Sequence, residues 1–422
     1  MTNTYNTHSS FFSYQQNNLH CENVPVDALA KEYGTPLYVY SKAALLHAFQ
    51  GYQQGLEGIP HLIAFAVKAN GNLSILKLLG EKGAGADLTS GGEMHSALKA
   101  GIPTEKLVFS GVGKSDTEIR DAVEAGVLML NIESEPELDN IQAIAASLGK
   151  TANIAVRVNP NIDAKTHPKI STGLKEHKFG VPAERAVALY ERAAAMPNIY
   201  IRGIAAHVGS SLPDTEPLLH AVEKLLDFKA QLQAKGIKIT HFDVGGGLGI
   251  QYQNENQETP NQYAGKLRDR LKDEGVTLVV EPGRSIVGNA SVLAAQILYV
   301  KRTDDRTFVV VDAGMNDLAR PAIYGAYHEI VPVNHADGAA ETVDVVGPVC
   351  ESSDVFGKQR VLPNCERGQY LAMCSAGAYG YAMASYYNGR VRPAEVLVDG
   401  STHRLIRRRE THEDLWRNQV IS

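Results

Sequence analysis

Lys68, in the segment FAVKAN, follows an apolar run that predicts a β-strand. An ammonium group is costly to bury, and desolvation lowers the pKa of a lysine from its ordinary value of about 10.4. A lysine in such a place is a nucleophilic amine suited to bond covalently to a carbonyl compound. The structural alternative is a lysine that reaches solvent or pairs with a carboxylate, and Lys68 alone does not separate the two.

A glycine-rich turn, DVGGGLG, provides a second chemical group. Its successive glycines, Gly245–Gly247, let backbone N–H groups approach an anion closely, as phosphate-binding turns require. Such turns are common, so this one indicates a phosphate site only together with its surroundings. Another segment, SGVGKS at 110–115, is similar to a nucleotide-binding loop, but Val108 stands where that loop needs its first glycine. We therefore do not expect ATP binding there.

The segments EPGR and AHVGS add three more polar groups, Glu281, Arg284 and His207, at the ends of predicted strands. A carboxylate such as Glu281 can keep a pyridine nitrogen protonated, which makes the ring a strong electron sink. A guanidinium binds a phosphate or carboxylate through two parallel hydrogen bonds, and an imidazole can stack on a ring. A structural Glu–Arg pair and an ordinary hydrogen-bonded histidine are the alternatives for each residue alone. Together with Lys68 and the glycine turn, these residues form the set that pyridoxal phosphate (PLP) chemistry needs.

The elements that must position these groups alternate regularly between residues 36 and 290. This strand–helix alternation predicts an α/β fold with a (β/α)8 barrel of the TIM type, and an open doubly wound sheet is the structural alternative. The polar residues at strand ends favour the barrel, which gathers the ends of many strands at one rim. The predicted strands lie at 62–67, 85–88, 107–110, 127–132, 153–158, 201–208, 241–244 and 277–281.

Helix signals are clearest at 214–235, where Asp214 is the predicted cap, Pro217 lies near the first turn and Gly236 ends the helix. A further helix is predicted at 41–54. Residues 163–180 form the one long loop predicted between a strand and a helix.

After residue 290 the pattern changes to short alternating segments separated by Gly and Pro turns, which predicts a mostly β domain. We expect a PLP-binding barrel at 36–290 and a β-sandwich or barrel-like C-terminal domain formed by 1–35 and 291–422. The predicted strands there include 307–314, 342–347, 369–375 and 394–400.

Composition excludes several classes of protein. The net charge of -6 argues against a nucleic-acid partner, and no apolar run is long enough to span a membrane. The polar N-terminus and four cysteines without paired spacing predict a cytoplasmic protein. The histidines show no metal-ligand spacing, so we expect no metal site.

Seven motifs together resemble the diaminopimelate decarboxylases, which are fold-type III PLP enzymes related to alanine racemase and eukaryotic ornithine decarboxylase. The resemblance covers the chain from about residue 12 to 398. CESSD combined with RPAIYGAYH is specific to this family, whereas FAVKAN or EPGR alone indicates only the superfamily. The motifs are FAVKAN, GGGLGI, EPGR, RPAIYGAYH (320–328), GPVCESSD (347–354), GAYGYAMAS (377–385) and RPAEVLVDG (392–400).

The resemblance implies how the residues would bind PLP. Lys68 would carry the cofactor covalently, His207 would stack on its ring, Glu281 would pair with the ring nitrogen, and Asp87 would lie near the ring. The residues implied around the phosphate are Ser210, Gly245, Gly246, Gly247, Gly283, Arg284 and Tyr379.

The resemblance also implies the reaction, the decarboxylation of meso-2,6-diaminopimelate to L-lysine, the last step of lysine biosynthesis. Cys350 would protonate the α-carbon, and Glu351 would bind the distal amino group. In this family both reach the active site from the partner subunit, which implies a homodimer with shared active sites. The residues implied to bind the substrate are Arg284, Arg320, Tyr324, Glu351 and Tyr379.

Other enzymes and one binding protein are the rivals. A decarboxylase acting on ornithine, arginine or carboxynorspermidine would share the fold, but Glu351, Arg320 and Tyr324 suit a substrate with a second carboxylate and amine. A racemase of this fold pairs the ring nitrogen with Arg, whereas this chain has Glu281. A catalytically dead regulatory relative would typically lack Lys68 or Cys350.

Overall fold

The computed structural model describes residues 5–162, 178–212, 214–334 and 339–421, so most of the predicted loop 163–180 lies outside the described residues. The chain divides into two compact units. The barrel unit comprises residues 49–249 and 256–285, and the β-rich unit comprises 1–48, 250–255 and 286–422.

In the barrel unit, eight parallel strands close into a barrel within the described part of the chain, which confirms the predicted TIM-type fold. An open sheet is excluded because the paired strands form a closed ring. The last strand pairs with the first, with Val279 opposite Leu62, and the fourth strand pairs with the fifth, with Leu130 opposite Ile154. The strands are β5 (His61–Ala66), β6 (Gly85–Leu88), β7 (Leu107–Phe109), β8 (Met129–Ile132), β9 (Ala152–Asn159), β11 (Ile199–Ala205), β12 (His241–Asp243) and β13 (Thr277–Val280).

Small and medium apolar side chains fill the barrel interior. Ala64, Val108, Met129, Ala155 and Val279, from five different strands, form one buried cluster. Burial of these apolar side chains stabilises the closed barrel, and their modest size lets them fit in the narrow interior of an eight-stranded barrel.

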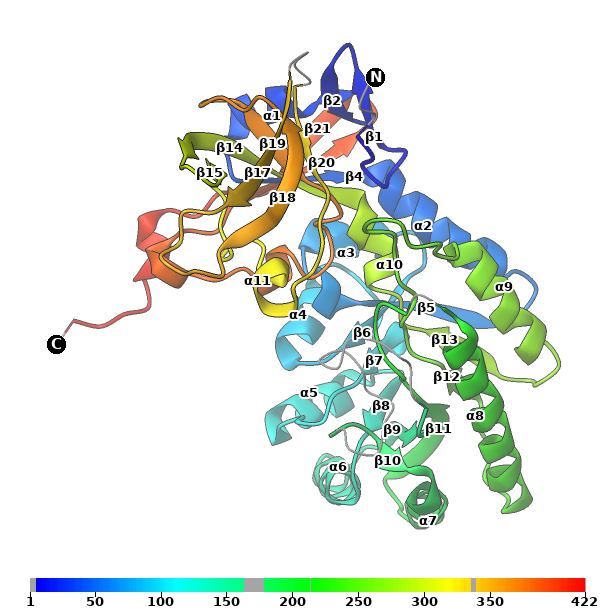
Figure 1. Cartoon of the computed structure of the whole chain (residues 1–422). Helices are drawn as coiled ribbons and strands as arrows, with labels where there is room; N and C mark the ends of the chain where they lie inside the picture. Colours follow the sequence, from blue (N-terminus) through cyan, green and yellow to red (C-terminus); the bar gives the residue numbers. More distant parts are fainter. Residues whose placement is uncertain (1–4, 163–177, 213, 335–338, 422) are drawn as a thin grey trace. The chain divides into compact units, whose positions relative to one another are not determined.

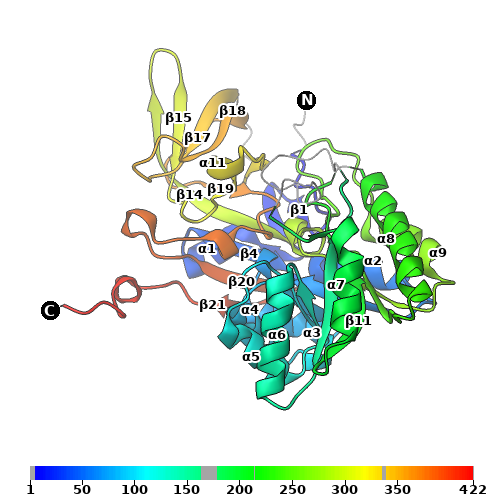
Figure 2. The ribbon, with the colours of Figure 1, turned by 90° about the horizontal axis from the view of Figure 1, so that it is seen from below.

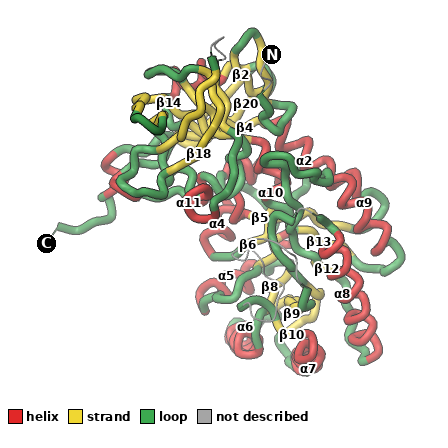
Figure 3. The backbone as a smooth tube through the Cα atoms, in the orientation of Figure 1, coloured by secondary structure: helices red, strands yellow, loops and turns green. Residues whose placement is uncertain are grey.

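Helices lie outside the barrel strands (Figures 1 and 2), and in Figure 3 they are the red coils around the yellow strands. Ser90, Ser115 and Ser134 start three of them by accepting a backbone N–H from the first turn, which ends each strand-to-helix loop sharply. The helices are α2 (Lys42–Gly55), α3 (Leu73–Gly80), α4 (Gly91–Lys99), α5 (Asp116–Ala125), α6 (Glu135–Ser147), α7 (Ala183–Ala194), α8 (Glu216–Ala234) and α9 (Pro260–Leu271).

The predicted helix at 214–235 is confirmed, but the predicted cap is wrong. Thr215, not Asp214, occupies the N-cap position, and the Asp214 carboxylate accepts the N–H of Glu216 from one residue further out. The Thr215 hydroxyl instead donates to Glu258 at 2.7 Å. Gly236 has φ +78°, which suits its predicted place after the helix end.

A large sheet organises the β-rich unit, and its path runs β18-β17-β15-β14-β4-β20-β21. The division of the units differs from the predicted boundary at residue 36, because β4 (Leu37–Ser41) pairs with β14 and β20 in this sheet. The other strands of the path are β14 (Ser291–Arg302), β15 (Thr307–Val311), β17 (Ala340–Val346), β18 (Val355–Pro363), β20 (Ala394–Asp399) and β21 (Thr402–Arg407), and β16 (Ile330–Pro332) and β19 (Tyr370–Met373) pair beside it.

The N-terminal arm packs into the core of the β-rich unit. Its short strands β1 (Phe12–Gln15), β2 (Asn18–Cys21) and β3 (Val24–Pro25) form a separate sheet. Leu19 donates its N–H to the carbonyl of Val333 at 2.7 Å, and its side chain is fully buried. No helix in the described ranges is long and apolar enough to cross a bilayer.

Candidate active site

Lys68 lies just past the end of β5, in the short 3-10 turn Val67–Ala69. Its Nζ forms an ion pair with Oδ2 of Asp87, at the end of β6, at 2.7 Å. The Asp87 side chain is fully buried, while that of Lys68 is 34% exposed. Two neighbouring strand ends therefore present a partly accessible amine against a buried carboxylate.

Glu281 follows β13 and belongs to a group of three buried carboxyl groups with Asp87 and Asp243. Burial raises the pKa of Glu281 well above its usual range, and the charges of Asp243 and Asp87 raise it further. Burial also raises the pKa of Asp243, at the end of β12. With its pKa raised in this way, the Glu281 carboxyl group keeps its proton to higher pH than an ordinary glutamate does.

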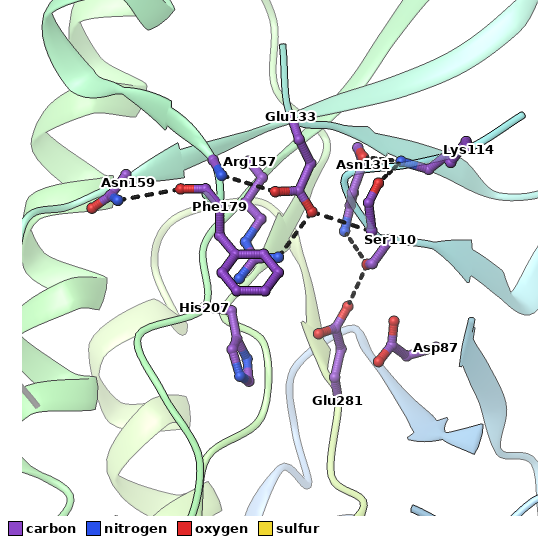
Figure 4. A network of polar contacts seen from close by, with 12 residues as sticks. Asp87, Ser110, Lys114, Asn131, Glu133, Arg157, Asn159, Phe179, His207 and Glu281 are labelled. Carbon is purple, nitrogen blue, oxygen red and sulfur yellow. Dashed lines mark hydrogen bonds and ion pairs between the residues drawn. The ribbon is translucent and has the colours of Figure 1, made fainter. Parts of the chain in front are cut away.

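Two uncharged side chains, Ser110 and Asn131, extend the hydrogen bonding from the Glu281 carboxyl group across the barrel rim, as Figure 4 shows. Asn131, in β8, donates to Oδ2 of Asp243 at 3.0 Å and to Oγ of Ser110 at 3.2 Å. The Ser110 hydroxyl in turn lies 3.5 Å from Oε1 of Glu281. Sequence reasoning did not assign roles to Ser110, Asn131 or Asp243, although an aspartate inside the apolar run HFDV was an available signal.

His207 lies two residues beyond the end of β11, and its imidazole is held by the glycine turn. The backbone N–H of Gly246 donates to Nδ1 at 3.2 Å, so in the neutral ring the proton is on Nε2. Burial lowers the pKa of His207 well below its usual range, and the positive charges of Arg157 and Lys68 lower it further. The ring is therefore a neutral, flat surface, which suits stacking on an aromatic ring.

The glycine turn requires glycine for steric reasons. A Cβ on Gly245, where φ is +68°, would lie 2.6 Å from Nδ1 of His207, and one on Gly246 would lie 2.3 Å from the carbonyl oxygen of Glu281. Next to the turn, Leu212 donates its N–H to the Gly247 carbonyl at 3.0 Å. The turn, the Glu281 strand end and the segment that carries His207 and Ser210 are thus packed backbone to backbone.

Substitution of Gly246 by alanine is expected to lower the free energy of unfolding by about 1–3 kcal/mol, because backbone must shift to admit the methyl group. The same shift should weaken cofactor binding. Gly113→Ala is the matched control, since a Cβ there meets nothing within 4 Å. Chemical denaturation and a cofactor titration of both variants test this, and equal results for the two variants would contradict it.

A second polar group, around Glu133, lies above His207 in the view of Figure 4. Oε1 of Glu133 accepts from Arg157 at 2.9 Å and from the N–H of Gly111 at 3.2 Å, and Oε2 accepts from Gly180 at 2.8 Å. Arg157 also lies over the ring of Phe179, 4.9 Å from its centre. Glu133 and Arg157 were not among the predicted site residues, although Arg157 interrupts the apolar run NIAVRV.

The segment at 110–115 is held in place by its lysine. Lys114 is almost fully buried and donates to the carbonyls of Gly111 and Asn131 and to Glu137, each at 2.7–2.8 Å. Its ammonium group is thus used to fix the loop.

In the β-rich unit, the loop that carries Cys350 and Glu351 is held by Asp354. Its buried carboxylate accepts the N–H of Val349 at 2.7 Å and that of Met315 at 2.6 Å. Burial raises the pKa of Asp354 from its ordinary value.

Two further contacts hold the same loop. Asn388 accepts the N–H of Cys350 at 2.9 Å, and the Tyr387 hydroxyl donates to Glu351 at 3.3 Å. Cys350 and Glu351 are both exposed on the chain.

The remaining predicted residues divide between the units. Gly283 and the buried Arg284 lie in the barrel unit, where a Cβ on Gly283 would meet Ala69 at 2.9 Å. Arg320 and Tyr324, at the two ends of α11 (Arg320–Tyr324), and Tyr379, with φ +55°, lie in the β-rich unit.

The barrel residues fit PLP on three grounds. A partly exposed amine at a strand end can form a covalent bond, and the glycine turn presents backbone rather than side chains at the rim of the same barrel. Two buried acceptor atoms, Oδ1 of Asp87 and Oδ1 of Asn131, have no hydrogen-bond partner in the protein. Buried acceptors of this kind are normally satisfied, so a bound polar molecule is expected at this rim.

Comparison with known proteins identifies the family. The family model for the pyridoxal binding domain of pyridoxal-dependent decarboxylases matches residues 42–288. A diaminopimelate decarboxylase of Neisseria meningitidis serogroup B is 50% identical over 402 residues, which cover 95% of this chain and 97% of that protein. The chain belongs to the diaminopimelate decarboxylase family. It is thus a PLP-dependent decarboxylase, and the resemblance predicted from its motifs is confirmed.

Solved structures of diaminopimelate decarboxylases have the same fold. The Helicobacter pylori protein, complexed with L-lysine, is 45% identical with a TM-score of 0.90, and the match covers 93% of this chain and 98% of that one. The M. jannaschii protein is 38% identical with a TM-score of 0.94, over 98% and 99% of the two chains.

Proposed function

We propose that this chain decarboxylates meso-2,6-diaminopimelate to L-lysine and carbon dioxide. The observation that carries the proposal is the Lys68–Asp87 ion pair, with its amine 2.7 Å from a fully buried carboxylate at the rim of a barrel of this family. The extent of similarity to diaminopimelate decarboxylases along nearly the whole chain supports the choice of substrate.

The residues that would bind the cofactor lie mostly in the barrel unit. PLP, when bound, withdraws electrons from the α-carbon as the bond to the carboxylate breaks. Lys68 binds the cofactor covalently, and Asp87 fixes the position of Nζ. His207 presents a neutral ring face, and Glu281 holds the proton at the ring nitrogen, which strengthens the electron withdrawal. The glycine turn, with Ser210, Gly283, Arg284 and Tyr379, would bind the phosphate.

The substrate residues distinguish this reaction from its rivals. Arg284, Arg320 and Tyr324 bind the carboxylate that stays in the product, and Glu351 binds the amine beside it. Ornithine and arginine have no second carboxylate, so they leave the guanidinium groups without their partner. After carbon dioxide leaves, the Cys350 thiol gives a proton to the α-carbon.

We further propose a homodimer with two shared active sites, in which Cys350 and Glu351 reach the partner's barrel. Both are exposed on the isolated chain, as are the large side chains of Ile323, Tyr386 and Tyr387 in the same unit. A partner subunit that covers them would explain their exposure. The four cysteines are free, which suits a cytoplasmic enzyme.

Mixing two inactive variants tests the shared sites. Lys68→Ala and Cys350→Ala homodimers each have two damaged sites, whereas a mixed dimer has one intact site. Random exchange of subunits at equal amounts should therefore restore about 25% of wild-type activity. No recovery after confirmed subunit exchange would contradict the shared sites.

The substrate is tested with purified holoenzyme supplied separately with meso-diaminopimelate, ornithine, arginine and carboxynorspermidine. Carbon dioxide release from diaminopimelate alone, with L-lysine as the amine product, is expected. Preferred turnover of another substrate would keep the fold and the cofactor but overturn the roles of Arg320, Tyr324 and Glu351.

A further inference from the structure

Arg320 is a buried arginine, only 7% exposed, at the start of α11. Its Nη1 lies 2.8 Å from Nε2 of His328, a histidine that is fully buried. His328 is the last residue of the RPAIYGAYH motif, and it is not among the residues proposed to bind the cofactor or the substrate. The two residues lie in the β-rich unit, eight positions apart.

The protonation of His328 follows from its second contact. Nδ1 lies 2.8 Å from the carbonyl oxygen of Cys374, which can only accept a hydrogen bond. Nδ1 therefore carries the proton. A guanidinium can only donate, so Nε2 must present a lone pair to Arg320. His328 is thus a neutral imidazole that connects the backbone at the end of β19 to one edge of the guanidinium.

Tyr252 contacts the face of the same guanidinium. The Cζ atom of Arg320 lies 4.7 Å from the centre of the Tyr252 ring, which is within the range of cation–π contacts. The Tyr252 ring also meets His328 edge to face, with centres 5.5 Å apart and planes at 79°. Tyr252 is 7% exposed and lies in the short segment 250–255 that belongs to the β-rich unit.

These two contacts fix the orientation of the guanidinium, because His328 binds its edge and Tyr252 packs against its face. Both partners are uncharged, so these two contacts orient the guanidinium without neutralising its charge. A carboxylate partner at either place would orient Arg320 equally well but would compete with a bound anion.

We propose that His328 and Tyr252 are positioning residues that aim Arg320 at the second carboxylate of the substrate and thereby determine the preference for substrates that have one. The proposal rests on the function proposed above. Neither residue needs to touch the reacting atoms. Their loss should weaken binding of the second carboxylate in the ground state and in the transition state alike, which raises KM and leaves kcat nearly unchanged.

The test compares the binding of two ligands to holoenzyme by calorimetry. L-Lysine and 1,5-diaminopentane have the same two amino groups and differ only in one carboxylate. His328→Leu is expected to weaken L-lysine binding by about 10–100-fold, because misplacement of a positioning group by about 1 Å has effects of this size. Binding of 1,5-diaminopentane should change by less than about threefold. KM for meso-diaminopimelate should rise by the same factor as the L-lysine dissociation constant.

Tyr252→Leu is the second variant, in case His328→Leu does not fold. It should show the same selective loss at about 3–10-fold, the size of one cation–π contact. His403→Leu is the matched control, since His403 contacts Tyr33 in the same unit. Equal weakening of both ligands, or no change in either, would overturn the proposal. A wild-type enzyme that does not turn over meso-diaminopimelate would instead overturn the proposed function.

Discussion

Holoenzyme in which Lys68 is replaced by alanine should release carbon dioxide at least roughly 10⁴-fold more slowly than the wild type, because the variant has no amine for the covalent bond to the cofactor. Lys68→Ala also removes the partner of the buried Asp87 carboxylate, so some loss of stability should accompany the loss of activity. Carbon dioxide release and thermal unfolding measure the two effects separately.

Lys68→Arg separates the chemical role of the side chain from its charge. Arginine keeps a cation beside Asp87, but its guanidinium is not nucleophilic, so this variant should be as stable as the wild type and as inactive as Lys68→Ala. Borohydride reduction followed by peptide mapping should place the cofactor on Lys68 in the wild type. A cofactor found on Lys114 or another lysine, or activity above about a tenth of wild type in either variant, would contradict this role.

Glu281→Gln is expected to change activity and stability in opposite directions. Glutamine cannot supply the proton to the ring nitrogen, and loss of one preorganised electrostatic group of this kind lowers kcat by about 10²–10³-fold. Without cofactor, however, the variant should be more stable than the wild type at neutral pH, because it removes a carboxyl group that resists ionisation in the fold.

The sign of the pH dependence follows from the pKa of Glu281, which burial raises above its ordinary value. Below the unfolded pKa, near 4.3, both states are protonated and the stabilities of wild type and variant differ least. As the pH rises from there, the unfolded wild-type chain releases its proton while the folded chain retains it, so the wild type loses stability. The gain in melting temperature of Glu281→Gln should therefore grow between about pH 5 and 8. Asp214→Asn, on the surface of the same unit, is the control, and a gain that shrinks with pH would contradict the buried, protonated carboxyl group.

Much of the barrel could be predicted from the sequence because each strand is a short apolar run with a polar residue at its carboxyl end. Lys68 and Glu281 were predicted as site residues in this way, since both follow such runs directly. The cap at Asp214 was misjudged because Asp214 and Thr215 are adjacent candidates, and only the tertiary contact of Thr215 with Glu258 distinguishes them.

The residues that sequence reasoning missed act through partners that are distant in the chain. Asn131 and Asp243 are 112 positions apart, yet they are joined by a 3.0 Å hydrogen bond across the rim. No sequence pattern singles out Tyr252, because its proximity to Arg320 depends on how segment 250–255 packs in the fold. A charged residue inside an apolar strand, such as Arg157, was the one sequence feature that could have identified part of this network.

The most direct measurement of the proposed function follows the reaction of meso-diaminopimelate in deuterium oxide by NMR and mass spectrometry. We expect one molecule of carbon dioxide and one of L-lysine per substrate molecule, with a single solvent-derived deuterium on the carbon that lost its carboxylate. Release of carbon dioxide without L-lysine, or recovery of diaminopimelate with deuterium at an α-carbon and no carbon dioxide, would contradict decarboxylation of this substrate.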